Sequence, residues 1–255
     1  MMAVLSTERK MTRILLSIVT AFGALCCASL PAFGQAGENA TLPLPPNPPP
    51  PGKGIPDLNG VWVMPYTPDL ARPLKAPIPF TPFGAEMFKN HVGGDDPHGF
   101  CQPTGPTRAF HSPFPFQIVQ TAGMLTVLFE IDHNFRRIFT DGRSHPKDLD
   151  STWYGDSVGS YEGGSLTVDT IGLSDRSWLD TAGHQHSDKL HITEKFTRTG
   201  PDTFLWTVTY DDPVYFTRPW SVSLTARREK YDIMEMICMD NNQDIPHYIT
   251  SQPKR

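Results

Sequence analysis

The residues best suited to chemistry lie in the middle of the chain, where five of its nine histidines fall between residues 133 and 191. His184 and His186 are one residue apart, so an extended backbone would place both imidazoles on the same side. His191 and Glu194 follow shortly after. Histidine exchanges a proton near neutral pH, and a nearby carboxylate can act with it as acid or base. We therefore predict a catalytic group of Glu194, His186, His191 and His145.

Three charged residues share a strand face with apolar neighbours. Alternate residues of a strand face the same side, so a charge in register with apolar residues points toward the interior. Glu194, Arg137 and Arg228 all have this pattern, and Arg137, for example, alternates with Phe135 and Phe139. We expect these charges either to form an internal ion pair or reach water at a barrel rim, or to face a ligand in a cavity.

The segment 132–146 gathers acidic, basic and imidazole side chains around an Asp-Gly turn. Arginine binds carboxylates through paired hydrogen bonds, so this group could hold an anionic or polyhydroxylated ligand. The alternative is a solvated strand end with surface ion pairs. The predicted ligand-binding residues are Arg143, Asp141, Arg137 and Arg228.

The histidines also suit a divalent metal. Imidazole nitrogens and a carboxylate satisfy zinc or a similar ion, and the metal ligands would be His184, His186 and His191. No other cofactor is indicated, because phosphate-loop and dinucleotide motifs are absent from the sequence. Ser157 fits the pattern G-x-S-x-G, but no helix follows its strand, so a hydrolase nucleophile is not predicted there.

A family resemblance is carried by DGRSHP at 141–146, TWYGDSVGSYEGGSLTVDT at 152–170 and HSDKLHITE at 186–194. These runs resemble the motifs DGR-x-HP, G-x-S-x-G-x-WEGDTLVVDT-x-G and HS-x-x-LH-x-x-E of a family of exported, largely uncharacterised proteins from environmental bacteria. Tyr161 replaces the usual Trp, and Gly164-Ser165 replaces Asp-Thr. The resemblance extends over about residues 57–240 and implies no particular reaction. It places on the motif Asp141, Arg143, His145, Ser157, Glu162, Asp169, His186, His191 and Glu194.

A second resemblance is to lipocalins and other calycins. These proteins carry G-x-W near the first strand and place an arginine of a late strand over that tryptophan. Gly60-Val61-Trp62 fits the first feature, and Arg227 or Arg228 fits the second. The resemblance implies a calycin-like barrel.

The elements that must position these residues are strands. From Phe116 onward, β-branched and aromatic residues alternate with polar ones, and turn residues interrupt them at short intervals. No helix-length segment separates the runs, which favours an antiparallel meander closed into a β-barrel of eight to ten strands, with a sandwich as the alternative. The expected strands are 116–121, 123–131, 135–140, 152–161, 165–171, 189–198, 202–210, 219–228 and 232–239.

The remaining segments are irregular. Residues 57–115 are rich in proline and should wrap around the barrel, with one short helix near Phe83 to Asn90. The 17-residue stretch 172–188 is unusually long for a connection, and such loops are often functional. We expect the predicted site where this loop meets the barrel mouth. Because His191 and Glu194 have opposite parity, one site can contain both only if the strand bulges between them.

The start of the chain is typical of export. Charged residues, an apolar run and small residues follow one another in residues 1–34, which predicts a cleaved signal peptide. A proline-rich linker at 35–56 would precede a single barrel domain at 57–255. We expect a periplasmic or extracellular protein without membrane insertion. In an oxidising compartment Cys101 and Cys238 should form a disulfide.

Composition narrows the partners. The formal net charge of -5 leaves no basic footprint for nucleic acid, so the expected partner is a small molecule. The sequence does not indicate an oligomeric state. Three classes of function remain open: acid-base catalysis of the isomerase, hydratase or lyase type on a small polar or anionic molecule, non-catalytic ligand binding in the cell envelope, and a structural envelope protein.

Overall fold

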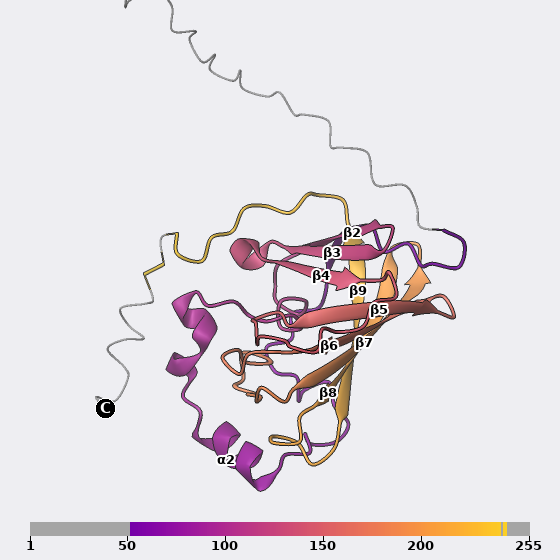
Figure 1. Ribbon diagram of the computed structural model, residues 1–255. Coiled ribbons are helices and arrows are strands. Elements are labelled where there is room, and N and C mark those ends of the chain that lie inside the picture. Colours follow the sequence, from indigo (N-terminus) through magenta and orange to yellow (C-terminus); the bar gives the residue numbers. More distant parts are fainter. Residues whose placement is uncertain (1–51, 241, 244–255) are drawn as a thin grey trace, which may run out of the picture. The chain divides into compact units, whose positions relative to one another are not determined.

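The computed structural model describes residues 52–240 and 242–243, and within them nine strands close into a barrel (Figure 1). This confirms the predicted all-β barrel of eight to ten strands. The predicted signal peptide and most of the predicted linker lie outside the described residues. The strands are β1 Gly60–Val63, β2 Phe116–Thr121, β3 Met124–Phe129, β4 Phe135–Phe139, β5 Asp156–Glu162, β6 Ser165–Ile171, β7 His191–Gly200, β8 Thr203–Asp211 and β9 Trp220–Glu229.

The order of strands around the barrel follows the chain from β1 to β9, and β1 pairs with β9 to close it. Every neighbouring pair is antiparallel except β4 and β5, which meet in parallel at Phe139 and Val158. The predicted antiparallel meander is therefore interrupted once. A parallel pair needs a crossover connection, and residues 140–155 supply it. This crossover contains the DGRSHP run, and its His145 contacts Asp156 on β5 and Asp169 on β6.

Strand β8 shows why these residues form a barrel wall. Its buried residues are Phe204, Trp206, Val208 and Tyr210, as the alternation predicts. The intervening threonines face outward, and the hydroxyls of Thr207 and Ser223 on β9 lie 2.8 Å apart. Such outer hydroxyl pairs and inner aromatic residues are the cross-strand contacts that stabilise sheets.

Two predicted boundaries differ from the structure. Residues 232–239, expected to be the last strand, follow β9 as an irregular segment, and β1 lies within the stretch expected to be irregular. The predicted short helix is confirmed as α2, Pro82–Asn90, where the Thr81 hydroxyl accepts a hydrogen bond from the Gly84 N–H at 3.0 Å. Proline in the first turn of a helix is favourable because its missing N–H has no partner there. Short 3₁₀ turns occur at Gly93–Asp95, Pro97–Phe100 and Ile131–His133.

Aromatic side chains fill the barrel interior. Phe110, which precedes β2 in the segment expected to wrap around the outside, instead inserts into the core. Its ring centroid lies 4.7 Å from that of Phe116, 5.2 Å from Phe129 and 5.4 Å from Trp206. The interior is therefore a packed core, and the pockets described below are built from connecting segments.

Those segments gather at one end of the barrel, which we call the loop end: the end where β6 and β8 finish and where β7 and β9 begin. The segment before α2 reaches the connection after β8, because the Thr81 N–H donates to the Tyr215 carbonyl at 2.9 Å. The 172–190 connection between β6 and β7 contacts the segment before α2. Its Asp180 carboxylate accepts a hydrogen bond from the Leu70 N–H at 2.7 Å. The loop end is therefore covered by several segments that contact one another.

A disulfide joins Cys101 to Cys238, as the sequence predicts, with 5.4 Å between their Cα atoms. It links the turn after Pro97–Phe100 to the irregular segment that follows β9. Among the described residues, none of the helices has the length and apolar character that crossing a membrane requires.

Candidate active site

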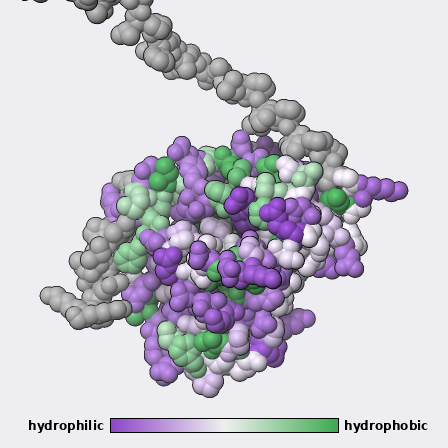
Figure 2. All heavy atoms as spheres, in the orientation of Figure 1, coloured by the Kyte–Doolittle hydropathy of each residue, from purple (hydrophilic) through white to green (hydrophobic). Residues whose placement is uncertain are grey.

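A pocket with a volume of about 590 Å³ lies at the loop end. Aromatic and aliphatic side chains form most of its wall, and a few polar groups interrupt them, which is the usual character of small-molecule sites. Figure 2 shows apolar side chains gathered over α2, which supplies part of this wall. The pocket is lined by Phe83, Met87, Pro97, Gln102, Trp153, Asp175, Arg176, Trp178, Gln185, His186, Ser187, Val214 and Tyr215.

His186, one of the predicted catalytic residues, lines this pocket and is otherwise buried. Its Nδ1 lies 2.9 Å from the Ser187 carbonyl oxygen, which can only accept, so Nδ1 carries the proton. Its Nε2 is therefore an acceptor, and it lies 3.0 Å from the Ser177 hydroxyl, which donates to it. Burial lowers the pKa of His186, although the carboxylates of Asp212 and Asp175 oppose this effect. His186 is thus held as a neutral base.

Asp212, the residue that follows β8, fixes the position of the chain beside His186. Its buried carboxylate accepts hydrogen bonds from the Ser187 N–H at 2.6 Å and from the Ser187 hydroxyl at 2.9 Å. It also accepts from the Val214 N–H at 3.0 Å. One carboxylate therefore joins the 172–190 connection to the turn that follows β8, on two sides of the pocket.

The polar groups of the pocket include one cation. The Arg176 guanidinium lies over the Trp153 ring, 4.4 Å from its centroid, and its Nε donates to the Ser174 hydroxyl at 3.0 Å. Stacking holds the guanidinium flat while leaving its outer edge for an anionic group. On another wall the Tyr215 hydroxyl lies 3.5 Å from Gln185 Oε1, and burial raises the pKa of Tyr215.

No model of a known protein family matches the chain, and no curated protein matches it. The pocket's chemistry follows from its own residues: a neutral imidazole, a stacked guanidinium and aromatic walls.

The four predicted catalytic residues lie in three separate places. His186 lines the pocket, Glu194 lies inside the barrel, and His145 and His191 lie on the outer surface. The register of β7 with β8 is regular from His191 to Glu194, so the bulge that would bring those two residues to one face does not form. The structure therefore brings His145 and His191 together through Asp169, and separates both from His186 and Glu194.

Glu194 forms an internal ion pair, one of the two arrangements expected from its parity. Arg136 on β4 donates to both of its carboxylate oxygens, and Trp206 Nε1 donates to Oε1 at 2.9 Å. Arg136 also donates to the hydroxyls of Ser157 and Thr170. With all these partners, Glu194 is fully enclosed and does not line the pocket.

The predicted inward orientation of Arg137 is wrong. On β4, Arg136 and Ile138 are buried, whereas Phe135 and Arg137 are exposed. The two phenylalanines that suggested an inward face lie on the outer one, where Arg137 and Arg143 lie over the Phe139 ring. The interior side instead satisfies Arg136 with a carboxylate and hydroxyls, which offsets the cost of burying its charge.

A group of polar residues on the outer surface, which includes His145 and Asp169, attaches the crossover to the barrel. His145, in the crossover, has Nδ1 2.6 Å from the Asp156 carboxylate on β5 and Nε2 3.0 Å from the Asp169 carboxylate on β6. The other Asp169 oxygen contacts His191 Nε2 on β7. Asp141 and Arg143 form an exposed ion pair with each other, which holds the pKa of the Asp141 carboxyl below its usual value. These predicted ligand-binding residues thus form surface contacts outside the pocket.

Arg228 occupies the position that the calycin resemblance implies. Its guanidinium lies over the Trp62 ring, 4.5 Å from the centroid, at the closure between β1 and β9. Trp62 is buried, and its Nε1 donates to the Leu58 carbonyl at 2.8 Å. Gly60 permits this packing, because a Cβ at its φ of 122° would lie 2.4 Å from Arg228 Nη1.

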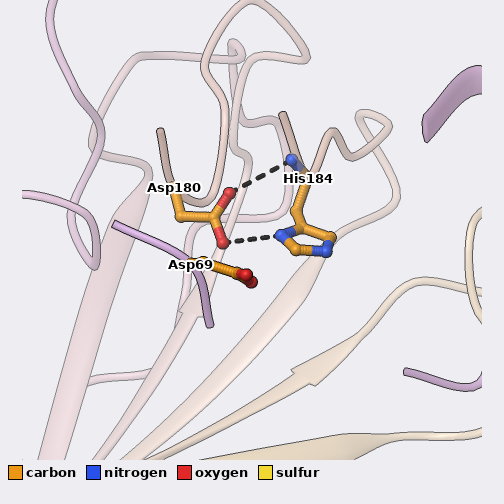
Figure 3. Close-up of side chains that lie close together, drawn as sticks. All are labelled: Asp69, Asp180 and His184. Atoms are coloured by element: carbon orange, nitrogen blue, oxygen red, sulfur yellow. Dashed lines mark hydrogen bonds and ion pairs between the residues drawn. The ribbon is translucent and has the colours of Figure 1, made fainter. Parts of the chain in front are cut away.

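The predicted metal ligands are not grouped together either. His184 lies close to Asp180 and Asp69, and Figure 3 shows the three side chains at the loop end. This is the set among the described residues whose ligand atoms lie close enough to suit a metal, within 4.8 Å of one another. However, Asp180 already accepts from Leu70 N, from His184 N and from His184 Nδ1 at 2.6 Å. As arranged, the cluster connects the loop to the segment that precedes α2.

The residues of the site that were not predicted from the sequence include Ser177, Arg176 and Trp153. Ser177 and Arg176 belong to the 172–188 loop that was singled out for its length, so the loop was a usable signal. Trp153 was assigned to a strand, although β5 begins at Asp156. Which residues of an irregular loop meet depends on its turns, which no periodic pattern reveals.

Proposed function

We propose that this protein is an exported enzyme that performs acid-base chemistry on a small organic molecule bound in the loop-end pocket. His186 is the base. The wall of Trp153, Trp178 and Tyr215 suits an aromatic or otherwise flat ligand, and Arg176 suits an anionic group on it. The disulfide fits export, because such bonds persist in oxidising compartments.

The observation that carries the proposal is the state of His186. A general base must be unprotonated at working pH and must lie within hydrogen-bond reach of the proton that it takes. Burial lowers the pKa of His186, and its tautomer leaves Nε2 as the acceptor. A neutral, oriented imidazole in the wall of a largely apolar pocket combines the features expected of an active site.

The isomerase, hydratase or lyase class that the sequence suggested requires His186 to take a proton from the bound molecule. Glu194 has no part in this proposal, because its carboxylate is used by Arg136 and Trp206 inside the barrel. In this form of the chemistry the ligand would replace Ser177 as the partner of His186 Nε2.

A second candidate function is non-catalytic binding. The observation that favours it is the largely apolar wall of the pocket, to which Phe83, Met87, Val214 and Tyr215 contribute. Such a wall binds a flat molecule through burial of apolar surface and needs no proton transfer. Both candidates share the same pocket and differ in the role of His186.

The test begins with a thermal-shift screen of aromatic carboxylic acids and their esters and amides against the mature chain. Compounds that raise the melting temperature are then incubated with the protein and followed by mass spectrometry. We expect Arg176→Ala to lose binding. We expect His186→Gln to lose turnover while it still binds the compound. The matched control His191→Ala alters a histidine outside the pocket and should behave like the wild type. If bound compounds are never converted, the binding function is favoured; if no compound depends on Arg176, the pocket proposal fails.

A further inference from the structure

We infer that Ser177 is a nucleophile, activated by His186, and that the reaction in this pocket is acyl transfer from an ester. The inference rests on the proposed function, in which His186 is the base, and names the proton that it takes. The proton is that of the Ser177 hydroxyl, which donates to His186 Nε2 over 3.0 Å.

The contacts of His186 fix the direction of this hydrogen bond. Because Nδ1 donates to the Ser187 carbonyl, Nε2 must accept, and the hydroxyl of Ser177 is its donor. A nucleophile, a base bonded to it and a third group that orients the base are the elements of nucleophilic catalysis by serine. Here the third group is a backbone carbonyl.

The loop is built so that Ser177 and His186 face each other. Trp178 and Gln185 form an antiparallel bridge, and the Leu179 N–H donates to the His184 carbonyl at 2.7 Å. Continuing this pairing by one residue places Ser177 opposite His186. Backbone pairing, rather than two freely rotating side chains, therefore sets the distance between nucleophile and base, which is the preorganisation that catalysis requires.

The backbone at Gly105 packs closely against the Ser177 hydroxyl. Gly105 has a φ of 80°, and a Cβ at that position would lie 3.0 Å from Ser177 Oγ. Ser177 is 4% exposed and does not itself line the pocket, but its chain neighbours Arg176 and Trp178 and its partner His186 do. Acyl transfer therefore requires the ester carbonyl to reach Oγ between these side chains. Low exposure strengthens the hydrogen bond by excluding water.

Apart from the ester, the reaction needs only water as a reagent. Ser177 Oγ attacks the ester carbonyl carbon while its proton passes to His186 Nε2. The bond from that carbon to the alcohol oxygen then breaks, and the imidazolium returns the proton to the departing alcohol. Water attacks the acyl-serine ester in the same way, His186 again taking and returning a proton, and a carboxylic acid leaves. The aromatic wall suits esters of aryl acids or aryl alcohols.

The experiment uses a fluorophosphonate probe, which phosphorylates activated serines, on the mature protein. Peptide mass spectrometry should locate the adduct on Ser177. Labelling should fall at least tenfold in Ser177→Ala and in His186→Gln, whereas Ser144→Ala, which changes an exposed serine of the crossover, should be labelled like the wild type. Hydrolysis of p-nitrophenyl benzoate should follow the same pattern.

If Ser177→Ala does not fold, Ser177→Cys provides the second variant, since a thiol paired with His186 should react with iodoacetamide faster than a free cysteine. A slow reaction, or an adduct on another serine, would overturn the inference. If Ser177→Ala keeps the turnover that His186→Gln loses, His186 acts directly on the ligand: the acyl-transfer inference then fails while the proposed function stands. If neither substitution changes turnover, both fail.

Discussion

Arg136 and Glu194 form a bidentate ion pair across the interior of the barrel, from strands β4 and β7, which are not neighbours in the sheet. The two side chains are 1% and 0% exposed. A buried pair stabilises a protein little relative to apolar residues of similar size, but the loss of one partner leaves an uncompensated charge in the core. Removing either residue alone should therefore destabilise the folded protein.

Glu194→Gln should lower the free energy of unfolding by about 3–5 kcal/mol, because the Arg136 charge would stay buried without its counter-charge. Replacing both residues, in Arg136→Met with Glu194→Leu, should restore most of that loss. Urea denaturation of the three variants measures this. A Glu194→Gln protein of unchanged stability that no longer binds or converts a ligand would instead support the catalytic role predicted from the sequence.

The same pair shows which parts of the fold can be predicted from the sequence. Alternation along the chain predicts most strands within a few residues, because apolar and polar residues follow the period of a strand. It also predicts that Glu194 points inward. It fails on β4, where a shift of one residue exchanges the two faces: Phe135 and Phe139 suggest the wrong one, and Arg136, not Arg137, enters the core.

The candidate site was also predicted only in part. The number of histidines and the length of the 172–188 loop lead to His186, which lines the pocket. The grouping of His186 with His145 and His191 does not follow, because the crossover carries His145 to the outer surface. Ser177 meets His186 through backbone pairing inside an irregular loop. That pairing depends on the turns of the loop, which have no periodic pattern in the sequence.

His145→Ala tests the crossover attachment. The substitution removes two hydrogen bonds to carboxylates, each of a class that contributes about 1.5–3 kcal/mol, so unfolding should become easier by a few kcal/mol at most. Ligand binding in the loop-end pocket should be unchanged. His191→Ala, which removes one contact to Asp169 from an exposed position, serves as the control and should cost less. Loss of ligand binding at normal stability in His145→Ala would place His145 in the functional site after all.

Reduction of the disulfide should destabilise the fold without unravelling the barrel core. Cys101 and Cys238 are 137 residues apart, and the chain-entropy model gives a contribution of about 5 kcal/mol for a loop of that length. Guanidinium denaturation of Cys101→Ser with Cys238→Ser, compared with the oxidised wild type, measures the difference. Free thiols titrated in the denatured, unreduced protein would show that the bond does not form.

The stability of the protein should fall as the pH drops from about 6.5 toward 4, and His111 should account for part of that fall. His111 is fully buried next to the filled core, and burial lowers its pKa to about 4, against the opposing effect of Asp180. The folded protein therefore keeps His111 neutral in this range, with Nε2 3.2 Å from the Leu179 carbonyl, while the unfolded chain takes up a proton below its usual pKa of about 6.5. The unfolded state then binds more protons, so each pH unit removes up to about 1.4 kcal/mol of stability for each such histidine, and below about pH 4 the loss from His111 is complete.

His186 acts in the same direction, since burial lowers its pKa as well. His111→Gln should make the slope of unfolding free energy against pH shallower by up to one proton between pH 6 and 5, where few carboxylates titrate. His191→Ala, on the outer surface, should leave the slope as it is in the wild type. Urea denaturation at intervals of half a pH unit measures all three curves. Parallel curves for His111→Gln and the wild type would mean that His111 is protonated in the folded state, and that its burial does not hold it neutral.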